Sequence, residues 1–310
     1  MIEGDDENNP MSVSETPAEL GYTASYLSFY KNKFMIFEIL LCLLWGFVSH
    51  DFTSALIPLN VRDVPYQQTQ NGDIILDMYF NHKLVDQTIS ETFLVLSCMI
   101  MPLVICILAA IVLKSRPSDF HASVCAFAFA VGTTTFLTNW VKYYDGYLRP
   151  NFYEYCGFDE DSLECEEDKS EPHKSFPSGH SSLSFCGMTF LALFFYGKAG
   201  MHRAVGGNSV GSEQYDEGTL LKKRMLSFLS GLPLLWAIFV AASRVHDNYH
   251  HPADVVGGSI LGLVCAWFSY HLWYPSLGSN VVGLPLQTVY ELQRNECSQR
   301  VSTASGSTYA

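Results

Sequence analysis

The stretch TFLVLSCMIMPLVICILAAIVL, residues 92–113, decides the fold class because it contains no charged side chain. An α-helix needs ~20 apolar residues to cross the hydrocarbon core of a bilayer, and this stretch is long enough. Comparable apolar runs lie at 34–50, 120–141, 181–197, 225–243 and 255–274. One such run also fits a buried helix of a soluble protein, but their recurrence predicts an all-α, polytopic membrane protein with about six transmembrane helices.

The run at 120–141 differs from the others because it carries Thr133, Thr134, Thr135 and Asn139. Polar side chains within a span usually contact other helices rather than lipid. We therefore expect this third helix to lie inside the bundle.

Composition and charge agree with a membrane protein. The 310 residues are 48% hydrophobic and 16% charged, whereas soluble domains carry about 25% charged residues. The net charge is -13 and no basic cluster with interleaved aromatic residues occurs. A nucleic-acid partner is therefore not expected, since binding a phosphate backbone requires a basic surface. The sequence indicates no particular oligomeric state.

The chain divides into three parts. Residues 1–30 are polar and acidic and are predicted to form a disordered cytoplasmic tail. Residues 31–275 hold all six runs and form the membrane domain. Residues 276–310 end in a Ser/Thr-rich stretch and predict a flexible cytoplasmic tail. No basic-then-apolar signal peptide precedes the first run, so we expect this run to remain as an anchor.

Lysine and arginine are unequally divided between the two sides of the predicted bundle. With a cytoplasmic amino terminus, that side holds Lys31, Lys33, Lys114, Arg116, Lys198, Arg203, Lys222, Lys223, Arg224, Arg294 and Arg300. The other side holds Arg62, Lys83, Lys142, Arg149, Lys169, Lys174 and Arg244. By the positive-inside rule, both termini are predicted to be cytoplasmic. The loops 51–91, 142–180 and 244–254 are then luminal or extracellular, in an endomembrane or the plasma membrane.

The cysteines differ in their surroundings. Cys156 and Cys165 share one polar loop, and they form a disulfide if that loop faces an oxidising compartment or remain free thiols otherwise. Thiols inside apolar runs act as small hydrophobic side chains. These are Cys42, Cys98, Cys106, Cys125, Cys186 and Cys265.

Three short motifs stand at the ends of runs, all on the predicted non-cytoplasmic side. KYYDGYLRP (142–150) closes the third run, and PSGH (177–180) opens the fourth. SRVHDNYHHPAD (243–254) links the fifth run to the sixth. In their order and spacing the motifs resemble the signature of the type 2 phosphatidic acid phosphatase superfamily, in particular its lipid phosphate phosphatase branch, over roughly residues 30–275.

The resemblance implies hydrolysis of lipid phosphates without a metal ion or other cofactor. The implied substrates are phosphatidate, lysophosphatidate, diacylglycerol pyrophosphate or sphingoid-base phosphates. His250 would attack phosphorus to give a phosphohistidine, and His180 would protonate the leaving group and then activate water. The site would lie where the third, fourth and sixth helices meet at the non-cytoplasmic face.

The residue types suit this chemistry. A phosphoryl group in transfer carries negative charge on its equatorial oxygens, and Lys142, Arg149 and Arg244 can stabilise that charge. Ser178 and the backbone N–H of Gly179 stand at a predicted helix start, which is a ready anion site. Asp254 follows His250 by four residues, so it can accept a hydrogen bond from that histidine on the same helix face.

Neighbouring residues allow two interpretations each. Lys174 is either a fourth cation or a solvated loop lysine, and Asp247 and His251 either tune the site or cap a helix. For His121, His202, His246 and His271 the sequence offers no partner, so structural roles are expected.

The segment 154–171 holds nine acids and lacks the order of a calcium-binding loop: Glu154, Asp159, Glu160, Asp161, Glu164, Glu166, Glu167, Asp168 and Glu171. We interpret it as a solvated acidic loop whose field disfavours soluble polyanions.

Two other enzyme functions are compatible with the same site residues, and a non-enzymatic role is a third alternative. A lipid phosphotransferase or a polyprenyl pyrophosphatase would need the same residues. A non-enzymatic relative that has lost the histidines is disfavoured, because His180 and His250 are both present.

Overall fold

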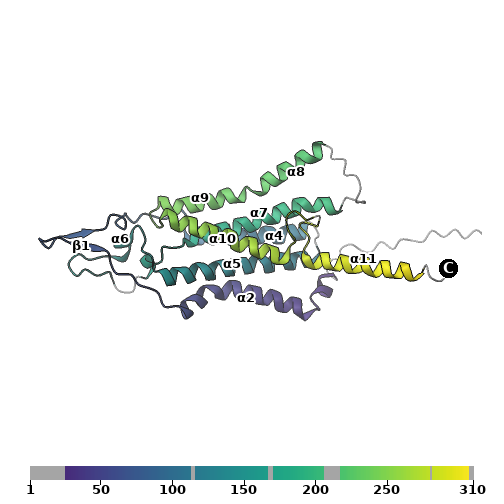
Figure 1. The fold of residues 1–310 in the computed structure, drawn as a ribbon, viewed down its shortest axis with the longest axis horizontal. Coiled ribbons are helices and arrows are strands. Elements are labelled where there is room, and N and C mark those ends of the chain that lie inside the picture. Colours follow the sequence, from purple (N-terminus) through teal and green to yellow (C-terminus); the bar gives the residue numbers. More distant parts are fainter. Residues whose placement is uncertain (1–24, 113–115, 167–169, 206–216, 280, 307–310) are drawn as a thin grey trace, which may run out of the picture.

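The computed structural model describes residues 25–112, 116–166, 170–205, 217–279 and 281–306 as a bundle of long helices with a loop region at one end (Figure 1). The helices are α2 (Lys33–Leu56), α3 (Glu91–Val95), the π-helical turn η1 (Leu96–Ile100), α4 (Met101–Val112), α5 (Pro117–Asp145), α6 (Phe152–Cys156), the 3₁₀ turn η2 (Glu171–His173), α7 (Gly179–Val205), α8 (Glu217–Ser230), α9 (Pro233–His246), α10 (Pro252–Trp273) and α11 (Leu286–Gly306).

Six helical segments are long and apolar enough to cross a membrane, which confirms the predicted fold class. They are Lys33–Leu56, Glu91–Val112, Pro117–Asp145, Gly179–Ala199, Arg224–His246 and Pro252–Trp273. In the described residues the only sheet is a two-stranded antiparallel hairpin, β1 (Tyr66–Gln68) paired with β2 (Ile74–Leu76). The chain is therefore a multi-pass membrane protein.

The helices differ in how deeply they are buried. Of the six spans α5 is the most buried, as its polar residues predicted, and α7 follows it. By contrast, α2 exposes large apolar side chains over most of its length, including Phe34, Phe37, Leu44 and Phe47. A surface of this kind is compatible with lipid and not with water.

Two spans are interrupted where the sequence predicted continuous helices. The second span changes from α3 to α4 through the π-helical turn η1. The fifth span breaks between α8 and α9 at Gly231 and Leu232, just before Pro233. Proline lacks the backbone N–H that would continue the helix, so α9 starts in a new direction (Figure 1).

Helices α7 and α10 approach each other closely through two glycines. A Cβ on Gly258 would collide with the carbonyl of Ser178, and one on Gly262 would collide with that of Ser182. Small residues four apart are a common device for such contact in membranes. The close contact brings the second motif, on α7, next to the third motif, at the start of α10.

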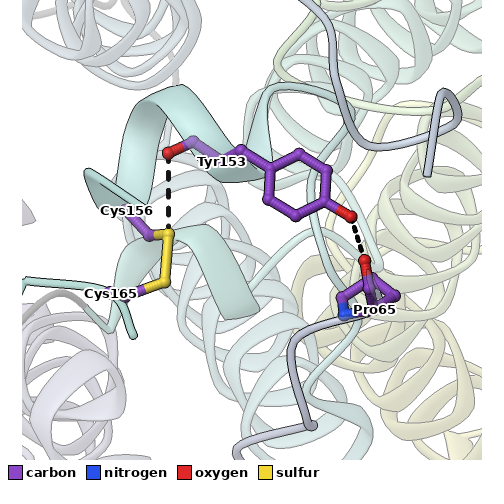
Figure 2. Close-up of a disulfide and its surroundings, with 4 residues drawn as sticks. All are labelled: Pro65, Tyr153, Cys156 and Cys165. Atoms are coloured by element: carbon purple, nitrogen blue, oxygen red, sulfur yellow. Dashed lines mark hydrogen bonds between the residues drawn. A yellow bond between two sulfur atoms is a disulfide. The ribbon is translucent and has the colours of Figure 1, made fainter. Parts of the chain in front are cut away.

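The loop region is held by one disulfide and a small apolar cluster. Cys156 and Cys165 are bonded to each other, so the disulfide alternative is the one observed (Figure 2). Tyr153 donates its hydroxyl to the carbonyl of Pro65 and accepts the N–H of Asp77 at 3.1 Å, which fastens the hairpin segment to α6. Leu148 and Phe152 complete this cluster.

The two tails are only partly described. Most of the predicted amino-terminal tail, residues 1–24, lies outside the described residues. In the carboxyl-terminal segment 276–310 the structure contains helix α11, where the sequence predicted a flexible tail; flexibility of this segment stays a prediction.

Candidate active site

The three motifs converge on a cavity of about 550 Å³ at the loop end of the bundle. Its wall includes the following predicted site residues: Lys142, Arg149, Gly179, His180, Arg244 and His250. The other two, Ser178 and Asp254, are fully buried behind this wall. The structure thus brings together side chains from α5, α7, α9 and the start of α10.

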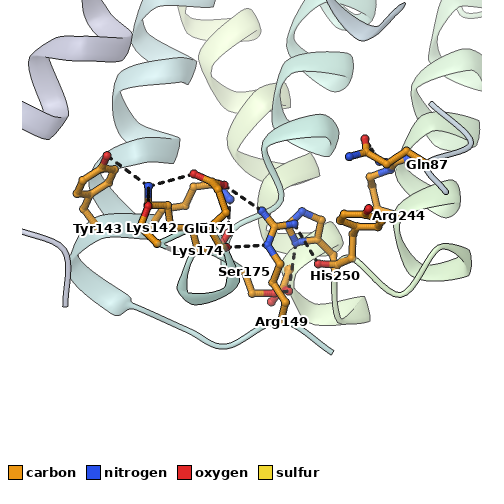
Figure 3. A network of polar contacts seen from close by, with 12 residues as sticks. Gln87, Lys142, Tyr143, Arg149, Glu171, Lys174, Ser175, Arg244 and His250 are labelled. Carbon is orange, nitrogen blue, oxygen red and sulfur yellow. Dashed lines mark hydrogen bonds and ion pairs between the residues drawn. The ribbon is translucent and has the colours of Figure 1, made fainter. Parts of the chain in front are cut away.

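The first motif reaches the cavity because α5 ends sharply. Gly146 adopts φ 61°, a left-handed conformation that glycine tolerates, and its N–H bonds the carbonyl of Lys142. Lys142 stays on the last helical turn, and its Nζ donates to the carbonyl of Lys174 at 2.5 Å. Arg149 follows the turn and points back toward the third motif (Figure 3).

Both arginines are held in place by several hydrogen bonds. Arg149 donates from Nε to the carbonyl of Glu171 at 2.9 Å and from a terminal nitrogen to the carbonyl of Tyr249 at 3.3 Å. Arg244 donates to the side chain of Gln87 at 3.2 Å and to Asp247 at 2.8 Å. Fixed guanidinium groups of this kind offer preorganised donors to an oxyanion.

His250 sits in a tight turn between α9 and α10. The N–H groups of Tyr249 and His250 both donate to the carbonyl of Arg244, at 3.1 and 3.2 Å. Asn248 supplies the left-handed residue of this turn at φ 59°. The turn therefore couples the position of His250 to that of Arg244.

Asp254 contacts both the ring of His250 and the second motif. His250 Nδ1 lies 3.4 Å from Oδ2 of Asp254, within ion-pair distance but without hydrogen-bond alignment. The same carboxylate oxygen accepts the hydroxyl of Ser175 at 2.5 Å and the N–H of His251 at 2.9 Å. The carbonyl of Asp254 accepts the N–H of Ser178 at 2.9 Å. Because Nδ1 faces Asp254, Nε2 is the ring nitrogen left for the cavity.

The electrostatic surroundings keep His250 neutral. Burial first, and then the positive charges of Arg149 and Lys142, hold the pKa of His250 well below its usual value. A neutral imidazole has the free lone pair that a nucleophile requires.

The second motif presents His180 at the start of α7. Ser178 lies just before the helix, and its hydroxyl accepts the N–H of Ser181 at 3.4 Å. Nε2 of His180 is buried without a hydrogen-bond partner. That nitrogen is free to exchange a proton with a bound group.

A known protein family matches the part of the chain that holds the three motifs. The PAP2 superfamily model matches residues 123–277, half of the chain, and this match includes all three motifs. The chain belongs to the PAP2 superfamily.

Within the PAP2 superfamily, relatives place the chain in the lipid phosphate phosphatase branch. It is 31% identical to lipid phosphate phosphatase 1 of Arabidopsis thaliana over 68% of this chain and 62% of the relative. It is 32% identical to lipid phosphate phosphatase 2 of the same plant, over 71% and 72%. Diacylglycerol pyrophosphate phosphatase 1 of Saccharomyces cerevisiae is 29% identical over 72% and 78%. No solved structure matches the chain.

The sequence left the roles of Lys174 and Asp247 at this PAP2 site open, and the structure shows specific contacts for both. Lys174 is buried rather than solvated, and its Nζ donates to Glu171 and Ser170 at 3.0 Å each. Asp247 pairs with Arg244 and accepts both the N–H and the hydroxyl of Thr88, at 2.8 and 2.7 Å. Although burial opposes it, hydrogen bonds from His246 and Thr88 and the charge of Arg244 lower the pKa of Asp247.

His251 holds the loop rather than lining the cavity. Its ring stacks on Tyr79 at 4.4 Å, and its Nε2 donates to the carbonyl of Leu148 at 3.2 Å. Burial lowers the pKa of His251, so the ring stays neutral and apolar enough for this packing.

Glu171 is a cavity residue that sequence reasoning did not single out. Its carboxylate lies 3.0 Å from Lys174 and 3.4 Å from Arg149. Burial works against ionisation, but the charges of Lys174 and Arg149 hold the pKa of Glu171 below its usual value. As one of nine acids in one segment it carried no distinguishing signal. The residues Glu167 and Asp168 of that segment lie outside the described residues.

Proposed function

We propose that the chain is a lipid phosphate phosphatase that hydrolyses phosphatidate-type phosphomonoesters through a phosphohistidine on His250. The observation that carries the proposal is the convergence on one cavity of a neutral, buried imidazole and three cations, two from the first motif and one from the third, beside His180 of the second. The distance between Asp254 and His250 supports the assignment of Asp254 as the residue that orients the nucleophile.

In the first step, the lone pair on Nε2 of His250 forms a bond to phosphorus as the bond between phosphorus and the lipid oxygen breaks. His180, in its protonated form, donates a proton from Nε2 to the departing alkoxide, so that a neutral lipid alcohol leaves. Lys142, Arg149 and Arg244 stabilise the equatorial oxygens, which carry most of the charge in the transition state.

In the second step, neutral His180 removes a proton from water while the water oxygen attacks phosphorus. The bond between phosphorus and Nε2 of His250 breaks, and inorganic phosphate is released. His180 is protonated again at the end of the cycle, and His250 is neutral again. The cations supply the positive charge of both steps, and the proposal assigns no step to a metal ion.

Lipid phosphates are the proposed substrates for two reasons. The cavity lies at the ends of membrane spans, and its wall includes the apolar side chains Leu94, Val95 and Leu183 beside the cations. The names of the plant and yeast relatives specify lipid phosphate and diacylglycerol pyrophosphate. A headgroup can therefore reach the cations while its chains stay in the bilayer.

The decisive experiment incubates purified protein with labelled phosphatidate in detergent micelles containing EDTA and follows free phosphate. We expect release by the wild type and none by His250→Asn. A His271→Asn variant, whose ring lies on α10 outside the cavity and hydrogen bonds to the carbonyl of Trp267, serves as the matched control and should retain activity. A long-chain alcohol included as acceptor tests the phosphotransferase alternative, because transfer would give a new lipid phosphate in place of free phosphate.

We also propose that the cavity faces the lumen or the cell exterior, with both termini in the cytoplasm. The disulfide between Cys156 and Cys165 supports this orientation, because such bonds persist in oxidising compartments. Asp73→Thr creates a glycosylation acceptor at Asn71 in the hairpin turn, and Cys297→Thr creates one at Asn295 in α11. Glycosylation of the first variant alone is expected; glycosylation of the second alone would reverse the orientation.

A further inference from the structure

The end of the bundle opposite the cavity holds a second cluster of reactive side chains. Glu38 and Cys42 lie four residues apart on α2, and His121 and Cys125 lie four residues apart on α5. Residues with this spacing share one helix face. His121 Nε2 lies 3.1 Å from Oε2 of Glu38 and 3.5 Å from Sγ of Cys125. The three ligand atoms of Glu38, His121 and Cys125 all lie within 4.8 Å of one another.

These separations match the edges of a small coordination polyhedron. Zinc binds nitrogen and oxygen at about 2.0 Å and sulfur at about 2.3 Å, so neighbouring ligands of a tetrahedral ion lie roughly 3.3–3.5 Å apart. The donor set of carboxylate, imidazole and thiol also suits zinc, which accepts oxygen, nitrogen and sulfur ligands.

Hydrogen bonding alone leaves this cluster poorly satisfied. A proton on Nε2 of His121 can point at either Glu38 or Cys125, but not at both. The ring of His121 is only 2% exposed. A cation at the shared point would bind the carboxylate of Glu38, Nε2 of His121 and the thiol of Cys125 together. A cavity of about 540 Å³, lined in part by Glu38 and His121, adjoins the cluster and gives an ion access.

One further residue supports the arrangement. The indole N–H of Trp273 donates to Oε1 of Glu38 at 2.8 Å, which orients the carboxylate and leaves Oε2 for a ligand. The sequence had offered only structural roles for His121 and Cys125, because Glu38 lies on another helix.

We propose that Glu38, His121 and Cys125 form a zinc site that joins α2 to α5. Binding forms the bond from zinc to sulfur as the thiol of Cys125 releases its proton. The site is separate from the phosphatase cavity, because His121 and Lys142 lie about 31 Å apart along α5 at 1.5 Å per residue. It therefore stabilises the bundle and takes no part in phosphoryl transfer.

The test measures zinc by mass spectrometry in detergent-purified protein prepared without chelator. We expect about one zinc ion per chain in the wild type and background levels in His121→Ala and Cys125→Ser. Cys265→Ser removes a buried thiol on α10 outside the cluster and should keep its zinc. Titration of metal-free wild type with Co²⁺ should give a thiolate charge-transfer band and the strong visible bands of a tetrahedral ion.

The cobalt spectrum needs no variant, so it decides the question even if a substitution prevents folding. Absence of both zinc and the charge-transfer band in folded wild type would overturn the proposal. A disulfide between Cys42 and Cys125 in the purified protein, or unchanged zinc in Cys125→Ser, would overturn it equally.

Discussion

Buried lysines at the two ends of the bundle have the same chemistry but different partners. Lys198, on α7, donates to both carboxylate oxygens of Asp119, at 2.5 and 2.6 Å. Lys142, on α5, donates to the carbonyl of Lys174, and no carboxylate in the described residues lies within ion-pair distance of it. The charge of Lys198 is neutralised locally, whereas that of Lys142 remains available.

The different partners of Lys198 and Lys142 show what distinguishes a phosphate site from a structural ion pair. Around the cavity the cations are positioned mainly by neutral groups: Arg149 by the carbonyls of Glu171 and Tyr249, and Arg244 by Ser243 and Gln87. Glu171 and Asp247 offset only part of this charge. A cavity whose positive charge is only partly offset attracts an anion, whereas a matched pair merely joins two helices.

Removing a cation of the cavity should have the largest effect. Arg244→Ala is expected to lower kcat/KM for phosphatidate by ~10²- to 10³-fold, the usual loss for one preorganised oxyanion donor. Arg62→Ala is the matched control, because Arg62 lies at the same end but is exposed and pairs with Asp145. If both variants lost activity equally, general surface charge rather than the cavity would be responsible.

Breaking the neutralised pair should affect stability instead. Lys198→Met leaves Asp119 buried without its cation, which costs about 3–5 kcal/mol in comparable pairs. We expect a clear fall in Tm in detergent, with kcat/KM of the folded protein changed less than about threefold. Lys198→Met combined with Asp119→Leu should recover much of the Tm. If Lys198→Met lowered kcat/KM as strongly as Arg244→Ala, the contrast between the structural ion pair and the cavity cations would be wrong.

The pH dependence of stability follows from His250. Its pKa in the folded protein lies well below the ~6.5 of an unfolded histidine. Between these two values the unfolded state binds more protons, so stability is present above pH ~6.5 and is lost as the pH falls.

Tm should therefore decrease between pH 7 and 5.5, because the free energy of unfolding falls by up to about 1.4 kcal/mol per pH unit for this group. His250→Asn should flatten the decrease, and the exposed control His50→Asn should not. Identical pH profiles for wild type and His250→Asn would show that His250 does not contribute.

The smallest expected effect concerns the anion that partly neutralises the cavity. Glu171→Gln should raise kcat/KM for a water-soluble phosphate ester by about two- to fivefold, because a half-exposed ion pair contributes little. Glu160→Gln, in the same acidic segment but farther along an exposed loop, is the matched control. Unchanged activity in Glu171→Gln would reject the idea that the acidic segment disfavours soluble polyanions.

The sequence predicted the features that depend on local pattern. The apolar runs located all six spans, and the polar residues Thr133 to Asn139 placed the third span inside the bundle. The location of the spans needed only helix length and the thickness of a bilayer. That the three motifs meet at one site was implied by the resemblance to a known superfamily, and the structure brings their side chains to one cavity.

Features that depend on contacts between distant segments could not be predicted. Glu171 reaches Arg149 and Lys174 only because η2 folds back over the cavity. Asp247 acquires its role from Thr88, far away in the sequence. The break before Pro233, by contrast, has a local cause in the proline itself.

Trapping the phosphoenzyme tests the central claim most directly. Wild type, His180→Ala and His250→Asn would be quenched with base after brief exposure to ³²P-labelled phosphatidate, since phosphohistidine survives base and is lost in acid. The account predicts base-stable, acid-labile label on His250, accumulation of that label in His180→Ala, and none in His250→Asn. Label on another residue, or unchanged label in His250→Asn, would contradict it.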